Sequence, residues 1–235
     1  MSGARPAALR PSIRRFAVAV DGPAGSGKSS VSRAAARELG FDYQDTGAAY
    51  RALAWLAAQR GVDVDLEDAV IGLLDDFDYE IGLDPDDYFV RVGRDTVTEA
   101  IRDPAVSAIV SRVARIPRVR EHLTDIFRGR IAQGDRPGII TEGRDITTIV
   151  APDAPVRVLL TASEAARQAR RAAELGGDTS GSVGQQLSAR DAQDLRVVDF
   201  MNAAEGVTTL DSTDLDFEQT VAALVALIRG VPPAG

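Results

Sequence analysis

A glycine-rich segment near the amino terminus, Asp21–Ser29, limits the fold of this chain more than any other stretch of its sequence. The segment reads DGPAGSGKS and contains the pattern G-x-x-x-x-G-K-[ST]. An apolar run over residues 16–20 comes before it, and a stretch rich in Ala, Arg and Leu over residues 30–39 comes after it. The order strand, glycine-rich loop, helix is the context in which this pattern forms a phosphate-binding loop (P-loop).

The P-loop predicts that the chain binds a nucleoside triphosphate. Backbone N–H groups of such a loop, together with the N-terminus of the following helix, face phosphate oxygens. Lys28 is expected to bridge the β- and γ-phosphates, and the Ser29 hydroxyl to ligate Mg²⁺. A glycine-rich turn without a ligand is the alternative, and the complete motif between a strand and a helix argues against it. The residues expected around the triphosphate are Gly22, Pro23, Ala24, Gly25, Ser26, Gly27, Lys28, Ser29 and Ser30.

Length and composition limit the class of protein. A chain of 235 residues holds one α/β core and a small insertion, so we predict a single domain over residues 13–235 behind a disordered tail over 1–12. The net charge of −8 argues against a nucleic-acid partner. With no cysteine, the chain forms neither disulfides nor thiolate metal sites. No apolar run approaches the length of a membrane span, so we expect no membrane association and a cytoplasmic location.

Strand and helix patterns alternate along the chain, which predicts an α/β fold with a parallel sheet and flanking helices. Strands are expected over residues 16–20, 41–44, 138–142, 156–160 and 207–210. Helices are expected over residues 30–39, 48–59, 104–115, 117–132, after Ser163, and over 185–201 and 216–229. Ligands of such sheets bind at the carboxyl ends of the strands, where the P-loop, Thr46, Glu142 and Arg144 are expected to converge.

Two segments interrupt this alternation. Within residues 63–103, alternating runs over 79–83 and 88–92 flank a turn over 84–87, and a third run covers 96–98. This pattern predicts a small antiparallel sheet inserted into the core. The second segment, residues 164–201, contains a Gly- and Ser-rich stretch over 176–184 and is expected to form a mobile helical lid.

The chain carries more arginine near its expected site than one triphosphate requires. We find no Asn/Thr-Lys-x-Asp motif for guanine recognition, so a GTPase is not predicted. Two phosphorylated ligands bound face to face would need this much positive charge. The alternative is that each arginine lies on a solvated helix face. The arginines in question are Arg51, Arg120, Arg144, Arg167, Arg170, Arg171, Arg190 and Arg196.

Four motifs in order along the chain identify a resemblance. They are DGPAGSGKS at 21–29, DTGAAYR at 45–51, IPRVRE at 116–121 and EGRDI at 142–146. Together they closely resemble bacterial cytidylate kinases over nearly the whole chain, the inserted sheet included. The resemblance implies a P-loop NTPase-type fold in which the insertion binds the nucleoside monophosphate. It implies transfer of the ATP γ-phosphate to CMP or dCMP with Mg²⁺, by an enzyme expected to be a monomer.

The resemblance also implies roles for individual residues. The resemblance places Asp145 beside the cytosine base. A carboxylate in that position accepts a hydrogen bond from the 4-amino group of cytosine, where uracil has a carbonyl. The alternative is that Asp145 only pairs with a neighbouring arginine. Catalytic roles fall to Lys28, Arg144, Arg190 and Arg196, and contacts with ATP to Arg167 and Arg170. Thr46, Tyr50 and Arg51 are expected to line the CMP pocket, with Arg51 at the acceptor phosphate of CMP. The cytosine is expected to contact Ser111, Arg120 and Asp145, and the phosphate to contact Arg144. In the lid, Arg190 is expected at the phosphate and Asp194 at the ribose hydroxyls. Mg²⁺ contacts fall to Ser29 and Glu142.

This chain departs from the family pattern at several positions. Thr147 replaces a glycine and Ala151 a phenylalanine. The lid reads RDAQDLRVVDFM over 190–201, one residue short before Arg196 and without the usual Ser-Pro-Leu ending. Because one deleted residue rotates the rest of a helix by about 100°, Arg196 keeps its role only if the helix ends or bulges there.

Other functions stay open at this stage. A different P-loop kinase would act on UMP, dCMP, shikimate or gluconate, and the altered lid makes a catalytically silent nucleotide-binding regulator conceivable. An assembly ATPase is disfavoured because no segment resembles an oligomeric arginine finger.

Overall fold

The computed structural model describes residues 15–174, 192, 195 and 198–232. The predicted tail over 1–12, most of the predicted helix over 185–201, and Arg190, Asp194 and Arg196 therefore lie outside the described residues.

A parallel sheet forms the core of the described chain, with five strands in the order β2-β6-β1-β7-β8. Strand β1 lies in the middle, with Val20 opposite Glu142 of β6 and Val158 of β7. This order confirms the predicted α/β fold and brings the ends of β1, β2 and β6 to one edge. The strands are β1 (Phe16–Asp21), β2 (Asp42–Asp45), β6 (Gly138–Gly143), β7 (Val156–Thr161) and β8 (Thr208–Asp211).

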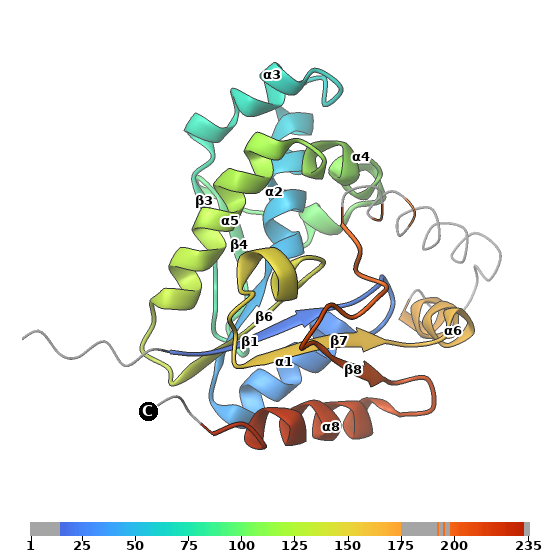
Figure 1. Ribbon diagram of the computed structural model, residues 1–235. Helices are drawn as coiled ribbons and strands as arrows, with labels where there is room; N and C mark the ends of the chain where they lie inside the picture. The colour runs from blue at the N-terminus through green and yellow to red at the C-terminus, as the bar shows by residue number, and fades with distance from the viewer. Residues whose placement is uncertain (1–14, 175–191, 193–194, 196–197, 233–235) are drawn as a thin grey trace, which may run out of the picture.

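Helices α1 (Lys28–Leu39) and α8 (Phe217–Arg229) pack together against one face of the sheet (Figure 1). Ala35, Leu224 and Val20 belong to the apolar cluster that this packing buries. Helix α6 (Glu164–Glu174) follows β7 and lies beyond the carboxyl end of the sheet (Figure 1). Within the described residues, no helix combines the length and apolar character needed to cross a membrane.

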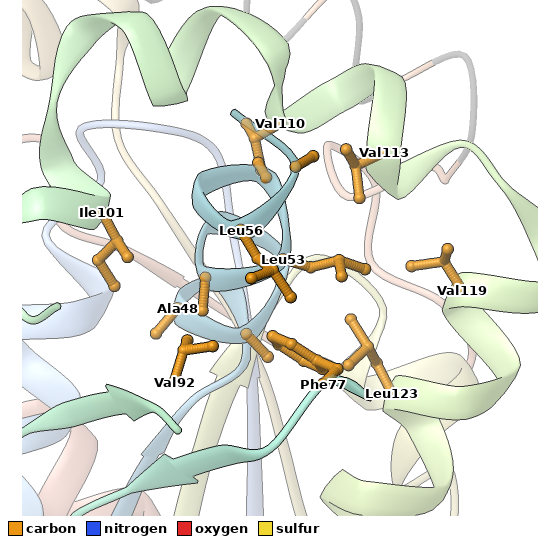
Figure 2. Close-up of a cluster of buried hydrophobic side chains, with 14 of the residues drawn as sticks. Ala48, Leu53, Leu56, Phe77, Val92, Ile101, Val110, Val113, Val119 and Leu123 are labelled. Atoms are coloured by element: carbon orange, nitrogen blue, oxygen red, sulfur yellow. The ribbon is translucent and has the colours of Figure 1, made fainter. Parts of the chain in front are cut away.

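A second apolar cluster surrounds helix α2 (Thr46–Gln59) and joins the insertion to the core (Figure 2). Helices α4 (Pro104–Ala114) and α5 (Pro117–Ala132) supply Val113 and Leu123, which are fully buried with Leu53 of α2. Small residues keep α2 narrow: Ala48, Ala49 and Ala52 are all fully buried. The close packing around α2 fixes the position of its first turn, where predicted site residues begin.

The insertion over residues 63–103 contains the predicted antiparallel sheet, with strands β3 (Tyr79–Ile81), β4 (Val90–Val92) and β5 (Asp95–Thr96). Tyr79 pairs with Val92 and Ile81 with Val90, which confirms the hairpin. Two details of the prediction were wrong. The strands are shorter than the alternating runs, and the third begins at Asp95 rather than Thr96. The insertion also contains helix α3 (Glu67–Ile71) and 3₁₀ turns over 74–76 and 100–102, all too short to give a helical period in sequence.

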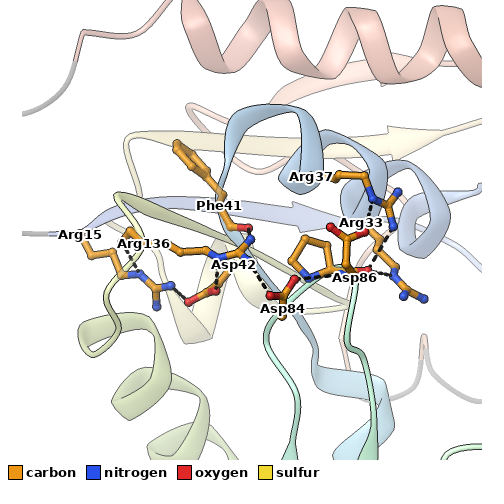
Figure 3. Close-up of polar contacts among 9 residues, drawn as sticks. Arg15, Arg33, Arg37, Phe41, Asp42, Asp84, Asp86 and Arg136 are labelled. Carbon is orange, nitrogen blue, oxygen red and sulfur yellow. Dashed lines mark hydrogen bonds and ion pairs between the residues drawn. The ribbon is translucent and has the colours of Figure 1, made fainter.

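The tip of this hairpin, residues 82–89, lies against the core beside β2 (Figure 3). Arg37 of α1 pairs with Asp86 at 2.6 Å, and Arg136 pairs with Asp84 at 2.6 Å. Arg33 donates to the Pro85 carbonyl at 2.6 Å, and the Tyr43 N–H donates to the Leu83 carbonyl at 2.8 Å. The insertion is therefore attached to the core at its tip as well as through α2.

The predicted helix over 185–201 does not reach its expected end, because residues 198–200 have no regular structure. The Asp199 carboxylate accepts hydrogen bonds from the N–H groups of Met201 and Asn202, at 3.0 and 3.2 Å. An aspartate that binds backbone N–H groups two and three residues ahead forms a turn that competes with a helix. Local hydrogen bonding therefore overrides the helical pattern here.

Candidate active site

The P-loop has the conformation that its glycines permit. Gly22, Gly25 and Gly27 have φ of +157°, +74° and +85°. A Cβ at Gly22 would collide with the Leu160 carbonyl, and one at Gly25 would lie 3.1 Å from the Arg167 carbonyl oxygen. Larger residues would open this loop, so its curvature depends on glycine. Helix α1 begins directly after it, at Lys28, and points its N-terminus at the loop.

Two arginines of α6 brace the P-loop from outside. Arg167, which is buried, donates to the Ala24 carbonyl at 2.9 Å. Arg170 donates to the Ser26 carbonyl at 3.2 Å, and also to Ser212 and Leu215. Both side chains therefore stabilise the loop through its own carbonyls. Their expected contacts with ATP stay a prediction.

Glu142, at the end of β6, lies beside the first turn of α1. Its Oε1 accepts hydrogen bonds from Ser29 Oγ at 2.7 Å and from Tyr43 Oη at 3.2 Å. Burial raises the pKa of Glu142, and the negative charge of Asp45 adds to this, while Lys28 opposes it. A carboxylate and a hydroxyl this close are oxygen donors of the kind that Mg²⁺ prefers.

Asp45, at the end of β2, holds the arginine expected at the acceptor phosphate. Arg51 donates to Asp45 Oδ2 at 2.7 Å, and the Ala48 N–H donates to Asp45 Oδ1 at 3.0 Å, so Asp45 also caps α2. Burial works to raise the pKa of Asp45, but Arg51, the Ala48 N–H and Lys28 together hold it below its usual value. Arg51 Nε is buried with no hydrogen-bond partner within the described structure. An orphaned buried donor of this kind fits an anionic ligand.

Arg120 and Asp145 form a second pair, in which Asp145 is buried and Arg120 is half-buried. Arg120 Nη2 donates to Asp145 Oδ2 at 2.5 Å, which is the contact that the alternative interpretation of Asp145 required. Burial raises the pKa of Asp145, and Arg120 opposes the shift. Tyr50 lies close enough for both charges to act on its hydroxyl, and its ring lies 6.2 Å from that of Phe127. Three residues predicted around the base are thus neighbours.

A π-helix over Ile146–Val150 directly follows Asp145. The N–H groups of Ile146 and Thr147 donate to Asp21 at 2.9 and 2.8 Å, and the Thr147 hydroxyl donates at 2.6 Å. Through its hydroxyl, Thr147 therefore adds a third hydrogen bond to the buried Asp21 carboxylate. Asp21 ends β1, so this contact ties the segment that carries Arg144 and Asp145 to the start of the P-loop.

Arg144 points back at the P-loop. Its Nη1 donates to the Gly22 carbonyl, and its charge lowers the pKa of Asp21, although burial raises that pKa more strongly. Its guanidinium also lies over the ring of Phe200, with Cζ 4.6 Å from the ring centroid.

The remaining predicted residues lie on the same side of the sheet. The Thr46 hydroxyl donates to the Glu142 carbonyl at 2.9 Å, and Ser111 is half-buried on α4, the helix packed against α2. A cavity of about 370 Å³ opens beside Arg120. Its other walls come from the π-helix, from the end of the predicted lid segment and from the chain that follows it, through Thr148, Ile149, Val198, Asp199, Asn202, Ala203 and Ala204.

Sequence reasoning missed several residues that organise this site. Asp21 and Asp45 end parallel strands and are the first residues of two of the four motifs, but neither was assigned a role. The rule that ligands gather at strand ends would have identified both. The sequence indicated no role in the site for Tyr43, because a tyrosine in a strand is ordinarily a core residue. Arg102, exposed at the end of the second 3₁₀ turn, acts through its charge on Asp45 and also escaped notice.

Comparison with known proteins agrees with this geometry. The family model for cytidylate kinase matches residues 18–230. The chain belongs to the cytidylate kinase family. It is 46% identical to the cytidylate kinase of Cutibacterium acnes over 214 residues, which cover 90% of this chain and 95% of that one.

A second relative, the cytidylate kinase of Streptomyces avermitilis, is 39% identical over 90% of this chain and 92% of its own length. A solved shikimate kinase from Bacteroides thetaiotaomicron matches 91% of this chain and 98% of its own, at 13% identity and a TM-score of 0.42, too distant to bear on the activity. The family assignment makes this chain an ATP-dependent nucleoside monophosphate phosphotransferase of pyrimidine nucleotide metabolism.

Proposed function

We propose that the chain transfers the γ-phosphoryl group of ATP to CMP or dCMP, with the residues of the described site in the roles that the family resemblance implies. The observation that carries this proposal is a pair of arginine–carboxylate contacts with buried carboxylates, Arg51–Asp45 and Arg120–Asp145. Each presents a cation and a hydrogen-bond acceptor, which suits a phosphate and a pyrimidine edge.

The acceptor phosphate needs no general base, because its attacking oxygen is already anionic. What the protein contributes is alignment of two anions and neutralisation of their charge. Lys28 would hold the β- and γ-phosphates, Arg51 the acceptor phosphate, and Arg144 the group in transfer. Arg51 can release part of its interaction with Asp45 to a phosphate, since Asp45 keeps its bond from the Ala48 N–H.

Mg²⁺ fits the arrangement of Ser29 and Glu142, whose oxygens lie 2.7 Å apart beside the P-loop. When bound, the ion would neutralise charge that develops on the β- and γ-phosphate oxygens. Tyr43 donates to the same oxygen of Glu142 and would hold this carboxylate in place.

Recognition of the base falls to Asp145 and Arg120. The Asp145 carboxylate would accept a hydrogen bond from the 4-amino group of cytosine, with Thr46 and Tyr50 lining the pocket and Ser111 on α4 completing the set. Arg120 would then hold both Asp145 and the carbonyl side of the base.

The lid residues Arg190, Asp194 and Arg196 keep their proposed roles, the first and last at the phosphates and Asp194 at the ribose hydroxyls. Replacing Arg190 and Arg196 separately by alanine tests the effect of the missing residue between them. Arg190→Ala should reduce kcat strongly. Arg196→Ala should match it only if a bulge restores its direction. A silent Arg190→Ala would remove the catalytic role of the lid.

An ADP-release assay across CMP, dCMP, UMP and AMP tests the proposal directly. We expect turnover on CMP and dCMP to exceed turnover on UMP and AMP. Equal rates on all four would contradict the assignment of Asp145 and Arg120, and no turnover on any would favour a nucleotide-binding regulator. We further propose that the enzyme acts as a monomer in the cytoplasm, which gel filtration and cell fractionation would test.

A further inference from the structure

We propose that Phe200 is a positioning residue for phosphoryl transfer, because its ring fixes the guanidinium of Arg144 against the P-loop. The inference rests on the proposed role of Arg144 at the transferred phosphate, and it assigns a function to a residue for which the sequence gave none.

Phe200 lies in an unusual environment for a buried aromatic residue. Its exposed fraction is 1%, yet within the described residues it belongs to neither apolar cluster. The contact that stands out is Arg144, whose Cζ lies 4.6 Å above the ring centroid. A cation over the face of a ring at this separation is attracted by the negative charge of the ring face.

The backbone that carries Phe200 is held without help from Arg144. Asp199, next to it, accepts the N–H groups of Met201 and Asn202 and the Asn202 side-chain amide at 2.9 Å. A few residues further, the Glu205 carbonyl accepts a hydrogen bond from Arg157 of β7 at 3.1 Å. Arg157 also donates to the Thr147 carbonyl at 3.4 Å, which joins this segment to the π-helix. The ring is therefore a fixed platform.

The position of Arg144 explains why a fixed ring beside its guanidinium matters. It follows Gly143 at the end of β6, and its guanidinium reaches the Gly22 carbonyl, 122 positions away in sequence. A guanidinium at the end of a long side chain can rotate about its hydrogen bonds unless a neighbouring group covers its face. The Phe200 ring covers its face and restricts this rotation, so the guanidinium stays directed at the phosphate site.

The test combines two substitutions. Phe200→Leu keeps the apolar volume but removes the ring, and we expect it to lower kcat on CMP about tenfold, a change worth about 1.4 kcal/mol and within the range of cation–π contacts. KM values for ATP and CMP should change less than about threefold, because the interaction acts mainly in the transition state. Phe200→Tyr keeps a π face and should stay near the wild-type rate. In an Arg144→Ala background, Phe200→Leu should have no further effect on kcat.

Stepwise fluorination of the Phe200 ring gives a second test that preserves its shape. Fluorine withdraws charge from the ring face, so kcat should fall progressively with the number of fluorines while the thermal midpoint stays nearly constant. Phe41→Leu serves as a matched control: Phe41 packs against Phe16 with centroids 6.0 Å apart, away from the site, and its loss should lower stability without changing kcat.

The outcomes separate this inference from the proposed function. If Phe200→Leu lowers kcat equally in both backgrounds, or fluorination has no effect, the ring does not act through Arg144 and the inference is overturned. If Arg144→Ala turns over CMP normally, the role of Arg144 fails together with the inference, while the CMP kinase assignment stands. If none of these proteins, the wild type included, phosphorylates CMP, the proposed function itself is wrong.

Discussion

Two regions of this molecule contain arginine–carboxylate pairs of nearly the same length in very different surroundings. At the hairpin tip, Arg37–Asp86 and Arg136–Asp84 are both 2.6 Å long. In the site, Arg51–Asp45 is 2.7 Å long and Arg120–Asp145 is 2.5 Å long. The side chains of the Arg37–Asp86 pair are 49% and 67% exposed, whereas those of Arg51–Asp45 are 15% and 8% exposed.

Access to water, rather than distance, separates the two regions. Water screens the pairs at the hairpin tip, so each adds little to stability. In the site, removing a charge from water is costly, and a partner that leaves must be replaced by another charge. The buried pairs therefore form a site that gains from binding anions and hydrogen-bond donors. The exposed pairs only attach the insertion to the core.

The largest expected difference between the two regions is in kcat, when one cation is removed from each: Lys28 from the site and Arg37 from the hairpin tip. Lys28→Ala should lower kcat by about 10²–10³-fold or more, since the lysine charge stabilises the phosphates in transfer. Arg37→Ala, also on α1, should leave kcat unchanged. Steady-state kinetics and circular dichroism on both variants check this. A folded Lys28→Ala enzyme with near-normal turnover would contradict the assignment of the P-loop as the site that binds the phosphates of ATP.

A second difference concerns the choice of substrate. Asp145→Ala should lower kcat/KM for CMP far more than for UMP, because a buried group left without its partner costs about 1–3 kcal/mol. Discrimination should shrink by about one to two decades, at about 1.4 kcal/mol per decade. Asp86→Ala at the hairpin tip should leave the CMP/UMP ratio unchanged. Equal losses on both substrates for Asp145→Ala would give Asp145 a structural role only.

The two regions should also respond to pH with opposite sign. Burial raises the pKa of Asp145, so between the unfolded value of about 3.9 and this higher pKa the native state binds more protons, and its stability falls as pH rises. The Asp86 N–H and Arg136 lower the pKa of Asp84, so its contribution is present above the unfolded value and is lost as pH falls through the lowered pKa.

Denaturant unfolding of wild type, Asp145→Asn and Asp84→Asn across acidic to neutral pH measures both effects. The stability of wild type relative to Asp145→Asn should decline as pH rises above about 4. Relative to Asp84→Asn, the stability of wild type should decline as pH falls below about 4. The same sign for both carboxylates would contradict the contrast between the regions.

The smallest expected effect concerns the stability contributed by one exposed pair. Arg37→Ala should lower the free energy of unfolding by about 0.5 kcal/mol or less, and less again at high salt, since water and ions screen the charges. Chemical denaturation at two salt concentrations measures this. A loss of several kcal/mol would show that the hairpin tip carries far more of the fold than its exposure indicates.

Much of the architecture could be predicted because it depends on local patterns. The P-loop motif between an apolar run and a helical stretch predicted β1, the loop and α1. The alternation of strand and helix patterns predicted a parallel sheet with flanking helices. Predictions failed where local hydrogen bonds or short elements decided the outcome. Asp199 ends the expected helix by binding the N–H groups ahead of it, and α3 is too short to give a period.

The sequence by itself determined the P-loop, the parallel α/β framework and the edge at which ligands bind, since these follow from the residue types within a few turns of chain. Only the tertiary structure decided which arginines face the site, such as Arg120, and which hold the hairpin tip against the core, such as Arg136. It also decided that Phe200 meets Arg144 and that Thr147 meets Asp21. Such partners lie far apart in sequence, and whether a charge faces water, a carbonyl or a buried carboxylate depends on how the elements pack.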